Sequence, residues 1–422
     1  MEKIKKIVKE NKALVENFSF LSVLQIFNLM LPLFSYPYLI RVLGVEVYGK
    51  IVFAQAIIGY FVILIAFGFG TSATIEVSVH RNDKDKLSEI VSSVIIIKVM
   101  LFLVTLTIMV PLLFFFKDAA NDKILYLTTL WVCFNEIFFP VFYFQGIEKM
   151  KYFSIISLIT RLVALVMIFV FIHSKGDYLL VPVFYFIGAL LSGISSFYIV
   201  FFQHDLRFYF PKFRVLKLYF NQTLPYFLTA LSANIYVTSN KVLIGLFLGV
   251  KEVSYYDMGE KILNILKIPI SILSQAVLPK ISHDRNLVFI RKIFKYSVSL
   301  NLLIYLGLFM FSKLIITTLG GEQMLPSIWV VRILGLTLPI VAVSNVFGTL
   351  TLVPFGFNKT FTMIIMSSAI FFMIQFLLVW SFNAVTIYSL CCITVMTEIL
   401  VAYLTYYHSK KNNLWITKST II

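Results

Sequence analysis

Charged side chains are scarce in this chain of 422 residues: Asp, Glu, Lys and Arg together make up 13% of it. A soluble globular protein carries about a quarter charged residues. The longest polar segment between apolar runs, residues 202–219, is too short to fold as a separate soluble domain. The three cysteines lie in apolar runs, so the sequence predicts no disulfide framework. Together these deficits exclude an ordinary soluble protein.

Hydrophobic residues instead make up 60% of the chain, and its mean hydropathy is +0.92. Apolar runs such as 51–69 and 91–116 reach the roughly 20 residues that a helix needs to cross a hydrocarbon core about 30 Å thick. They do not alternate between apolar and polar residues, as the strands of a membrane barrel do. The sequence therefore predicts an all-α, polytopic membrane protein.

About twelve transmembrane helices fit the pattern of apolar runs. They are predicted near 18–40, 51–72, 91–116, 124–146, 154–173, 179–201, 220–248, 255–279, 293–319, 328–354, 360–382 and 386–407. The lysine-rich N-terminus leads directly into the first span without the short apolar core and cleavage site of a signal peptide. Because twelve is even, both termini are expected on one side of the membrane.

The distribution of basic residues indicates which side that is. The two termini and the alternate loops on their side contain 23 of the 36 Lys and Arg residues, the opposite loops contain 6, and 7 lie within spans. Lysine and arginine are concentrated in cytoplasmic loops of membrane proteins. Both termini are therefore predicted to be cytoplasmic.

A weak internal repeat divides the chain into two halves. Leu43-Gly44-Val45 recurs as Leu248-Gly249-Val250, and Ser78-x-x-Arg81-Asn82 recurs as Ser282-x-x-Arg285-Asn286, each at an equivalent span border. Parallel repeats of this kind occur in secondary transporters. The predicted parts are a basic N-terminus (1–17), a six-helix lobe (18–201), a cytoplasmic linker (202–219), a second six-helix lobe (220–407) and a cytoplasmic tail (408–422).

Motifs for catalysis and for nucleic acid are weak or absent. The linker 202–219 interleaves basic and aromatic residues, but beside a membrane this pattern favours contact with anionic lipids over nucleic acid. Gly44–Lys50 imitates a phosphate-binding loop, yet no strand precedes it and Ile51 replaces the Mg²⁺-binding Ser or Thr, so a turn between spans is favoured. The five histidines stand singly, and no metal, cofactor or catalytic site is predicted.

Polar residues inside the spans are the candidate substrate-binding groups, because such residues are costly in hydrocarbon and usually face a cavity. One side of span 255–279 carries Lys261, Asn264 and Lys267, and Pro269 interrupts that helix. The other candidates are Gln25 and Asn28 in the first span and Asn234 and Lys241 in the seventh. The alternative is that these groups only hydrogen-bond between helices.

Further ionisable residues in spans suggest ion pairing or coupling. Glu136 and Glu398 lie well inside spans, and either could carry a coupling proton. Equally, Lys98 and Arg161 could pair with these carboxylates inside a bundle. Cations outnumber acids in the spans, which suits an anionic cargo better than a cationic drug.

Several ordered motifs along nearly the whole chain carry a family resemblance. They are Leu31-Pro32-Leu33, 37–44 (PYLIRVLG), Tyr48-Gly49, Phe67-Gly68-Phe69, Ser72-Ala73-Thr74, 143–150 (YFQGIEKM), Glu260-Lys261-Ile262, 275–282 (QAVLPKIS) and Thr397-Glu398. With them the chain resembles the O-antigen flippase (Wzx) family of polysaccharide transporters, within the multidrug/oligosaccharidyl-lipid/polysaccharide exporter superfamily.

The resemblance implies a V-shaped pair of lobes around a cationic cavity in the bacterial inner membrane. It implies an undecaprenyl-diphosphate-linked oligosaccharide as cargo, with Arg41 near the outer end of the cavity and Lys261 within a matching motif. Polysaccharide polymerase and chain-length machinery are the implied partners, besides membrane lipids. The alternatives are a cell-wall precursor flippase or a cation-coupled drug exporter of the same superfamily. A membrane-embedded glycosyl polymerase is disfavoured because all the outer loops are short.

The predicted topology can be tested with reporter fusions along the full chain. Fusions after Lys212 and Arg285 should report a cytoplasmic position, and fusions after Asp118 and Lys251 an external one, because of the 23-to-6 asymmetry in basic residues. An external signal after Lys212 would overturn the order of the spans.

Overall fold

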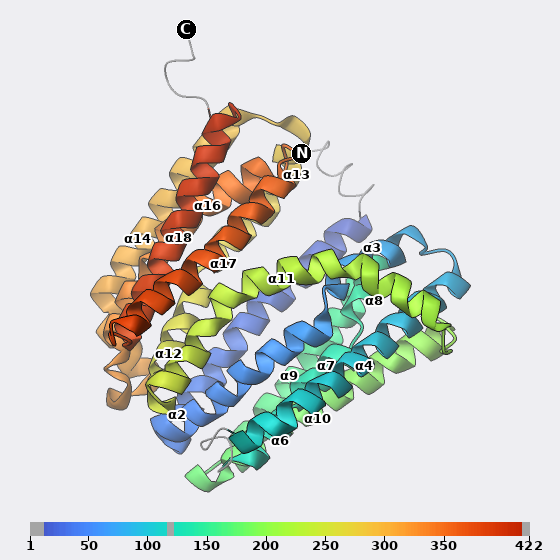
Figure 1. The fold of residues 1–422 in the computed structure, drawn as a ribbon, viewed down its shortest axis with the longest axis horizontal. Helices are drawn as coiled ribbons and strands as arrows, with labels where there is room; N and C mark the ends of the chain where they lie inside the picture. The colour runs from blue at the N-terminus through green and yellow to red at the C-terminus, as the bar shows by residue number, and fades with distance from the viewer. Residues whose placement is uncertain (1–11, 116–121, 416–422) are drawn as a thin grey trace. The chain divides into compact units, whose positions relative to one another are not determined.

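The computed structural model describes residues 12–115 and 122–415 (Figure 1). Within these ranges the chain forms helices and turns and no strand, which confirms the all-α class. In the described residues, ten helical stretches, some made of two or three consecutive helices, are long and apolar enough to cross a membrane, by length and composition. The number twelve stays a prediction.

The chain divides into two compact units. The division falls between Leu231 and Ser232 inside α11 (Phe213–Phe247), and the short stretch Tyr48–Phe53 of α2 (Lys12–Ala66) belongs with the second unit. The layout predicted for the two lobes, 18–201 and 220–407, stays a prediction.

Unit 1 packs its helices pairwise, with α10 against both α9 and α7, and α3 against α8. Its elements besides parts of α2 and α11 are α3 (Phe69–Val79), α4 (Lys84–Phe115), α6 (Lys123–Thr129), α7 (Trp131–Phe138), α8 (Val141–Gly146), α9 (Met150–Phe171), η1 (Lys175–Leu179), α10 (Leu180–Phe197) and the π-helical η2 (Tyr198–Gln203).

Unit 2 packs α14 against α16, α17 against α18, and α12 against α15. Its elements besides parts of α2 and α11 are α12 (Val250–Leu266), α13 (Ile268–Asp284), α14 (Leu287–Gly320), η3 (Glu322–Met324), α15 (Ser327–Gly335), α16 (Thr337–Ser344), the π-helical η4 (Asn345–Leu352), α17 (Asn358–Ser381) and α18 (Ile387–Lys411).

The repeated Leu-Gly-Val motif has the same backbone conformation in both copies. Gly44 kinks α2 with φ 79° and ψ 165°, and Gly249 precedes α12 with φ 99° and ψ 165°. A side chain is strained at such φ values, so glycine is the residue that permits both bends. The backbone thus leaves the helical conformation at Gly44, where the sequence predicted a turn between spans. Gly49 has another role: it lies inside the helix, where a Cβ would overlap the carbonyl of Val250.

Several predicted spans are broken helices. Lys267 separates α12 from α13 where Pro269 stands at the start of the second helix, as the sequence predicted. The predicted span 124–146 divides into α6, α7 and α8. The predicted linker 202–219 is irregular only over 204–212, because α11 begins at Phe213.

Three loops predicted to lie on one side of the membrane meet at one end of unit 1. Two ion pairs join them, Arg81–Glu148 and Lys84–Asp205, each at 3.3 Å. The imidazole of His204 lies 2.9 Å from the Tyr143 hydroxyl. Partial burial, with Lys149 and Lys84 nearby, lowers the pKa of His204 and favours its neutral form. The side of the membrane that this end faces stays a prediction.

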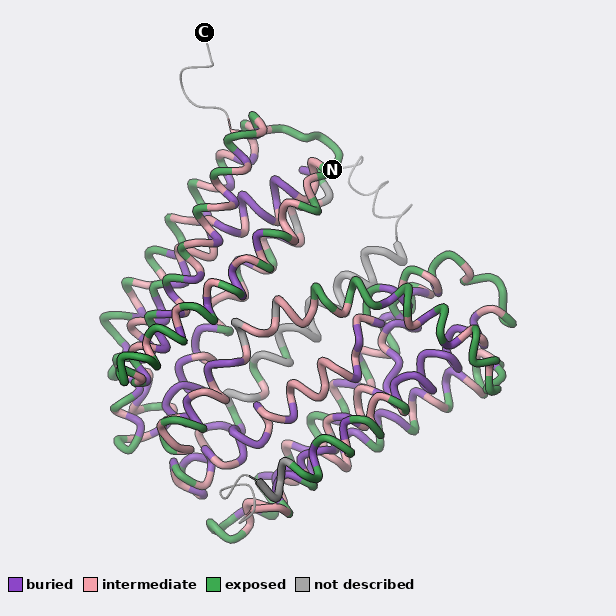
Figure 2. Tube along the Cα trace, in the orientation of Figure 1, coloured by how far each residue is buried: buried purple, intermediate pink, exposed green. Residues whose placement is uncertain are grey.

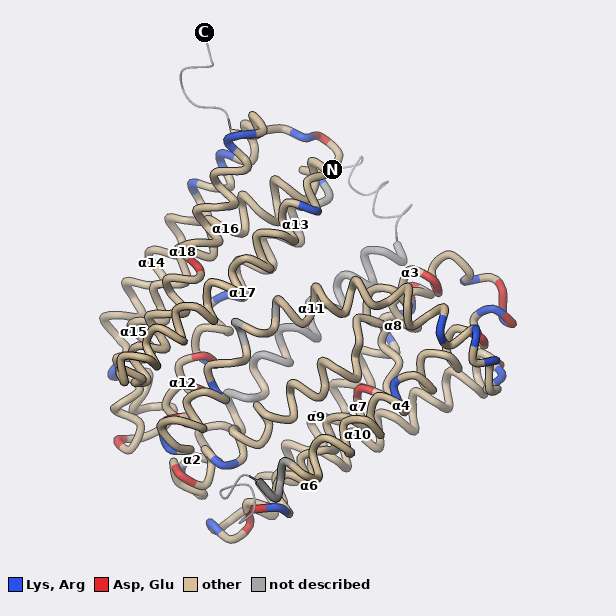
Figure 3. Tube along the Cα trace, viewed as in Figure 1, with Lys and Arg blue, Asp and Glu red and all other residues tan. Residues whose placement is uncertain are grey.

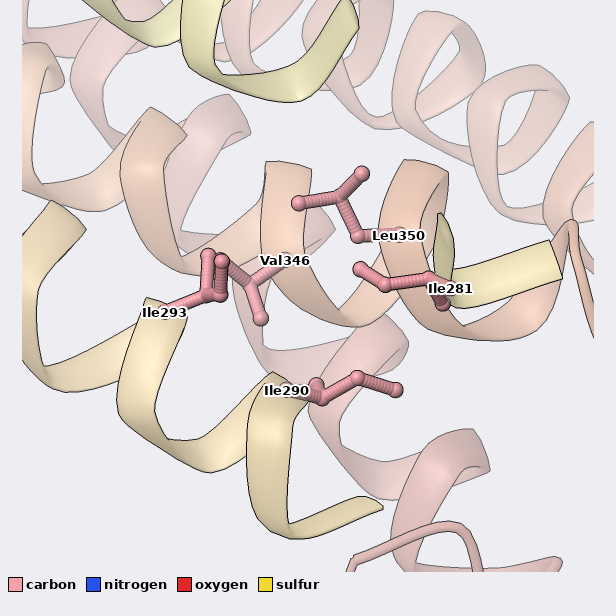
Figure 4. Packing of buried hydrophobic residues seen from close by; sticks show 5 residues of the cluster. All are labelled: Ile281, Ile290, Ile293, Val346 and Leu350. Carbon is pink, nitrogen blue, oxygen red and sulfur yellow. The ribbon is translucent and has the colours of Figure 1, made fainter. Parts of the chain in front are cut away.

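Burial and charge are distributed as a lipid environment requires. In each unit buried residues face the neighbouring helices, while the outward faces carry exposed apolar side chains (Figure 2). Charged side chains gather mainly at helix ends and loops (Figure 3). Near one end of unit 2, Ile281, Ile290, Ile293, Val346 and Leu350 of α13, α14 and η4 form a closed apolar cluster (Figure 4).

Candidate functional site

A network of ion pairs lies inside unit 2, among α11, α12 and the stretch of α2 that belongs to this unit. The Nζ atom of Lys241 lies 2.9 Å from Oδ1 of Asp257 and 2.6 Å from Oε2 of Glu260. Lys261 binds the other oxygen of Asp257 at 2.5 Å. The hydroxyl of Tyr48 donates to that same Asp257 oxygen at 2.9 Å, and Lys261 also contacts this hydroxyl.

Local helix geometry explains the network. Asp257 and Lys261 are four residues apart on α12, so both side chains extend from one face of this helix. The Asp257 side chain is only 3% exposed, and a carboxylate at such a site requires cationic partners. Two lysines face two carboxylates, so within this cluster the predicted lysines are neutralised by acids of the same unit.

A small cavity of about 80 Å³ adjoins the network. Among the residues that line it are Asn264, Lys267 and Glu398, together with Glu260. The structure therefore brings Asn264 and Lys267, two of the predicted substrate-binding residues, beside one of the predicted coupling carboxylates. They come from α12, the break before α13, and α18.

Unit 1 contains a larger cavity, of about 550 Å³, within its membrane-spanning helices. Its polar lining consists of amide and hydroxyl side chains and one guanidinium, that of Arg161. The polar residues are Gln55, Asn135, Ser157, Thr160, Arg161, Tyr185 and Ser192, from α2, α7, α9 and α10. Volumes of about 300–1,000 Å³ are typical of ligand pockets.

Two of the remaining cations inside the spans, Lys98 and Arg332, have local partners. The Nζ atom of Lys98 lies 2.6 Å from Glu136, an ion pair that the sequence offered as one possibility. Arg332 donates to Ser312 at 2.9 Å and stands over the rings of Phe309 and Trp329. No carboxylate of unit 1 forms an ion pair with Arg161 in the described residues, so the pairing suggested for it there is absent.

Two other predicted residues, Arg41 and Asn234, line neither of these two cavities. Arg41 is exposed on α2, close to the kink at Gly44, and Asn234 is half-buried on α11. The side chains of Gln25 and Asn28 lie outside those that the structure describes. The roles proposed for these four residues stay predictions. Within the described residues, no group of three or more His, Cys, Asp or Glu side chains could hold a metal ion.

Sequence reasoning missed two groups of residues. Asp257 and Glu260 stand near the beginning of the predicted span 255–279, and the spacing of Asp257 and Lys261 was the available signal. The cavity of unit 1 was missed because its residues come from four helices. Its available signal is the polar and small stripe of Ser157, Thr160, Arg161 and Ala164 on one face of α9.

Comparison with known proteins gives a family and two relatives. A family model described as "Polysaccharide biosynthesis protein" matches residues 14–284. A protein of Escherichia coli (strain K12) named "Putative O-antigen transporter" is 23% identical over 364 residues, which cover 85% of this chain and 88% of that protein. A protein of the same name from Shigella dysenteriae is 21% identical, with 89% of this chain and 94% of that protein covered.

Solved structures share the fold. One described as "Lipid II flippase MurJ, inward closed conformation" gives a TM-score of 0.71 at 16% identity, covering 94% of this chain and 87% of that one. A multidrug resistance MATE family transporter of the MOP superfamily, in an inward-facing conformation, gives 0.68 at 15% identity, covering 95% and 100%. At these identities the likeness shows the fold alone.

The ion-pair network can be tested by unbalancing it. Lys241→Ala leaves two carboxylates facing one lysine, and breaking a buried pair costs about 3–5 kcal/mol. We expect less protein in the membrane and a lower melting temperature in detergent. The double variant Lys241→Ala/Glu260→Gln again has one carboxylate, Asp257, facing one lysine, Lys261. It should therefore recover part of the lost protein level and melting temperature.

Lys313→Ala is the matched control, because this exposed lysine belongs to no ion pair in the described residues. Equal losses in the single and double variants would contradict the pairing role. Normal protein level with lost transport in Lys241→Ala would instead assign this lysine to the cargo.

Proposed function

Because the chain belongs to the polysaccharide biosynthesis protein family, we propose that it is a flippase for an undecaprenyl-diphosphate-linked oligosaccharide. In this proposal it moves the O-antigen or capsule repeat unit from the cytoplasmic to the outer leaflet of a bacterial inner membrane, by alternating access. It performs no covalent chemistry, and both of its termini are cytoplasmic. The resemblance noted in the sequence is confirmed at the level of the family.

The observation that carries the proposal is the match to two proteins named as O-antigen transporters over at least 85% of this chain. The cavity of unit 1 supports the choice of cargo. Its amides and hydroxyls can exchange hydrogen bonds with sugar hydroxyls, and its guanidinium can bind phosphate. The broken helix at Lys267 resembles the discontinuous helices that transporters use near their binding sites.

Two alternatives of the same superfamily differ in cargo. A cell-wall precursor flippase would carry a similar lipid diphosphate, and a lipid II flippase is among the structural neighbours. A cation-coupled drug exporter would require acidic groups where its cationic cargo binds. The residues that line the described cavity of unit 1 include one arginine and no carboxylate, which disfavours that alternative.

Complementation tests the function. The chain should restore surface polysaccharide in a strain that lacks its own O-antigen flippase but still assembles and polymerises the lipid-linked repeat unit. It should not sustain growth of a strain depleted of its lipid II flippase. Growth in the second strain, with no polysaccharide in the first at normal protein level, would favour the cell-wall precursor instead.

Coupling to a proton gradient is a separate proposal, in which Glu398 is the better candidate carrier. Glu136 already pairs with Lys98 at 2.6 Å, whereas Glu398 lines the small cavity of unit 2 and no ion pair is formed by it in the described residues. Glu398→Gln should therefore remove most of the dependence of flipping on an imposed pH gradient, while Glu136→Gln should retain it. Full gradient dependence in both variants would exclude both carboxylates.

A further inference from the structure

Arg161 differs from most other cations inside the membrane spans. Lys98, Lys241 and Lys261 are held by carboxylates, and Arg332 by a hydroxyl and two aromatic rings. Lys267 shares the small cavity of unit 2 with Glu260 and Glu398. Arg161 instead stands in the large cavity of unit 1, where the described lining residues include no carboxylate.

Among the described residues of unit 1, no carboxylate forms an ion pair with the guanidinium of Arg161 or lines its cavity. The neighbouring Tyr185 is hydrogen-bonded to Ser35 and is also close enough to Arg161 to interact with its guanidinium electrostatically. A full charge within membrane-spanning helices requires water, a counter-charge or an anionic ligand. The exposed side chain of Arg161 points to a ligand that enters the cavity.

Two amide side chains in the same cavity retain unused hydrogen-bonding groups. Asn135 accepts a hydrogen bond from the Ser192 hydroxyl at 2.9 Å through its oxygen, and its amino group has no partner among the described residues. For the half-buried Gln55, no hydrogen-bond partner is found among the described residues. Phe139 and Phe153, stacked at 5.1 Å between ring centroids, complete an aromatic wall.

These groups together match a phosphorylated sugar. A guanidinium binds phosphate oxygens through two parallel hydrogen bonds. Carboxamides both donate and accept, as sugar hydroxyls do, and aromatic faces cover the apolar face of a ring. A purely apolar ligand would leave Arg161, Gln55 and Asn135 desolvated without partners.

We propose that the cavity of unit 1 binds the phosphate and the adjoining sugar of the cargo, with Arg161 as the phosphate ligand and Gln55 and Asn135 as sugar ligands. This rests on the proposed flippase function and assigns the recognition of the polar head to unit 1. The lysines of unit 2, neutralised by Asp257 and Glu260, then serve the structure of that unit rather than the capture of phosphate.

Binding by the purified full-length protein tests the proposal. The probes are undecaprenyl diphosphate carrying N-acetylglucosamine, undecaprenyl diphosphate alone, and vesicles of phosphatidylglycerol. Arg161→Ala should weaken binding of both diphosphate lipids by at least about tenfold, the loss expected for a hydrogen-bonded charge partner. Arg161→Lys should recover part of it, because the charge remains without the bidentate geometry.

Variants of Gln55 and Asn135 distinguish recognition of the sugar from recognition of the phosphate. Gln55→Ala and Asn135→Ala should reduce the preference for the sugar-bearing lipid over undecaprenyl diphosphate alone, with little change for the latter. Arg332→Ala is the matched control, because it removes an arginine of unit 2 that lines none of the described cavities, and its binding should equal that of the wild type. Binding is normalised to folded protein in every variant.

Two results would overturn the assignment. One is unchanged binding of both diphosphate lipids by Arg161→Ala, and the other is equal weakening for phosphatidylglycerol, which would identify a general site for anionic lipid. The flippase function is tested apart from this, by complementation with the wild-type chain. If the wild-type chain restores polysaccharide but Arg161→Ala binds both diphosphate lipids normally, the proposed site is wrong and the flippase function stands. If binding depends on Arg161 but the wild-type chain does not restore polysaccharide, the site stands and the proposed flippase function is wrong.

Discussion

The cost of placing charge in a hydrocarbon core governs both units of this protein. A lysine or carboxylate removed from water loses more solvation energy than a single contact returns, so it persists only where partners surround it. In unit 2 that condition produces the cluster of Lys241, Asp257, Glu260 and Lys261, closed by Tyr48. In unit 1 it produces the pair of Lys98 and Glu136.

The same constraint makes the cavity of unit 1 informative. Its interior combines a guanidinium with amides and hydroxyls, and a polar interior of this kind is stable only when water or a polar ligand fills it. A protein that moves a sugar diphosphate past hydrocarbon has to replace the hydration of the cargo with its own polar groups. The proposed cargo and the observed lining are therefore complementary in chemistry.

The backbone obeys a parallel rule, since its polar groups must also be satisfied inside the membrane. In the described residues the chain meets this requirement with helices, which are interrupted at glycine and proline in several places. Gly44 and Gly249 bend the chain at the two copies of the Leu-Gly-Val motif, and Lys267 and Pro269 divide α12 from α13. The break at Lys267 lies beside the small cavity that contains Glu398, so here the departure from regular helix borders a polar site.

The sequence by itself determined the membrane class, the helical fold, the kink at Gly44 and the break before Pro269, because hydropathy, glycine and proline act locally. Its motifs also indicated the family. Only the tertiary structure decided which charges pair. Lys241 and Asp257 stand on different helices, and the cavity around Arg161 takes residues from four helices. The i, i+4 spacing of Asp257 and Lys261 is a local signal, but whether Lys241 and Arg161 are neutralised or open to a ligand depends on side chains from other helices, which no local pattern contains.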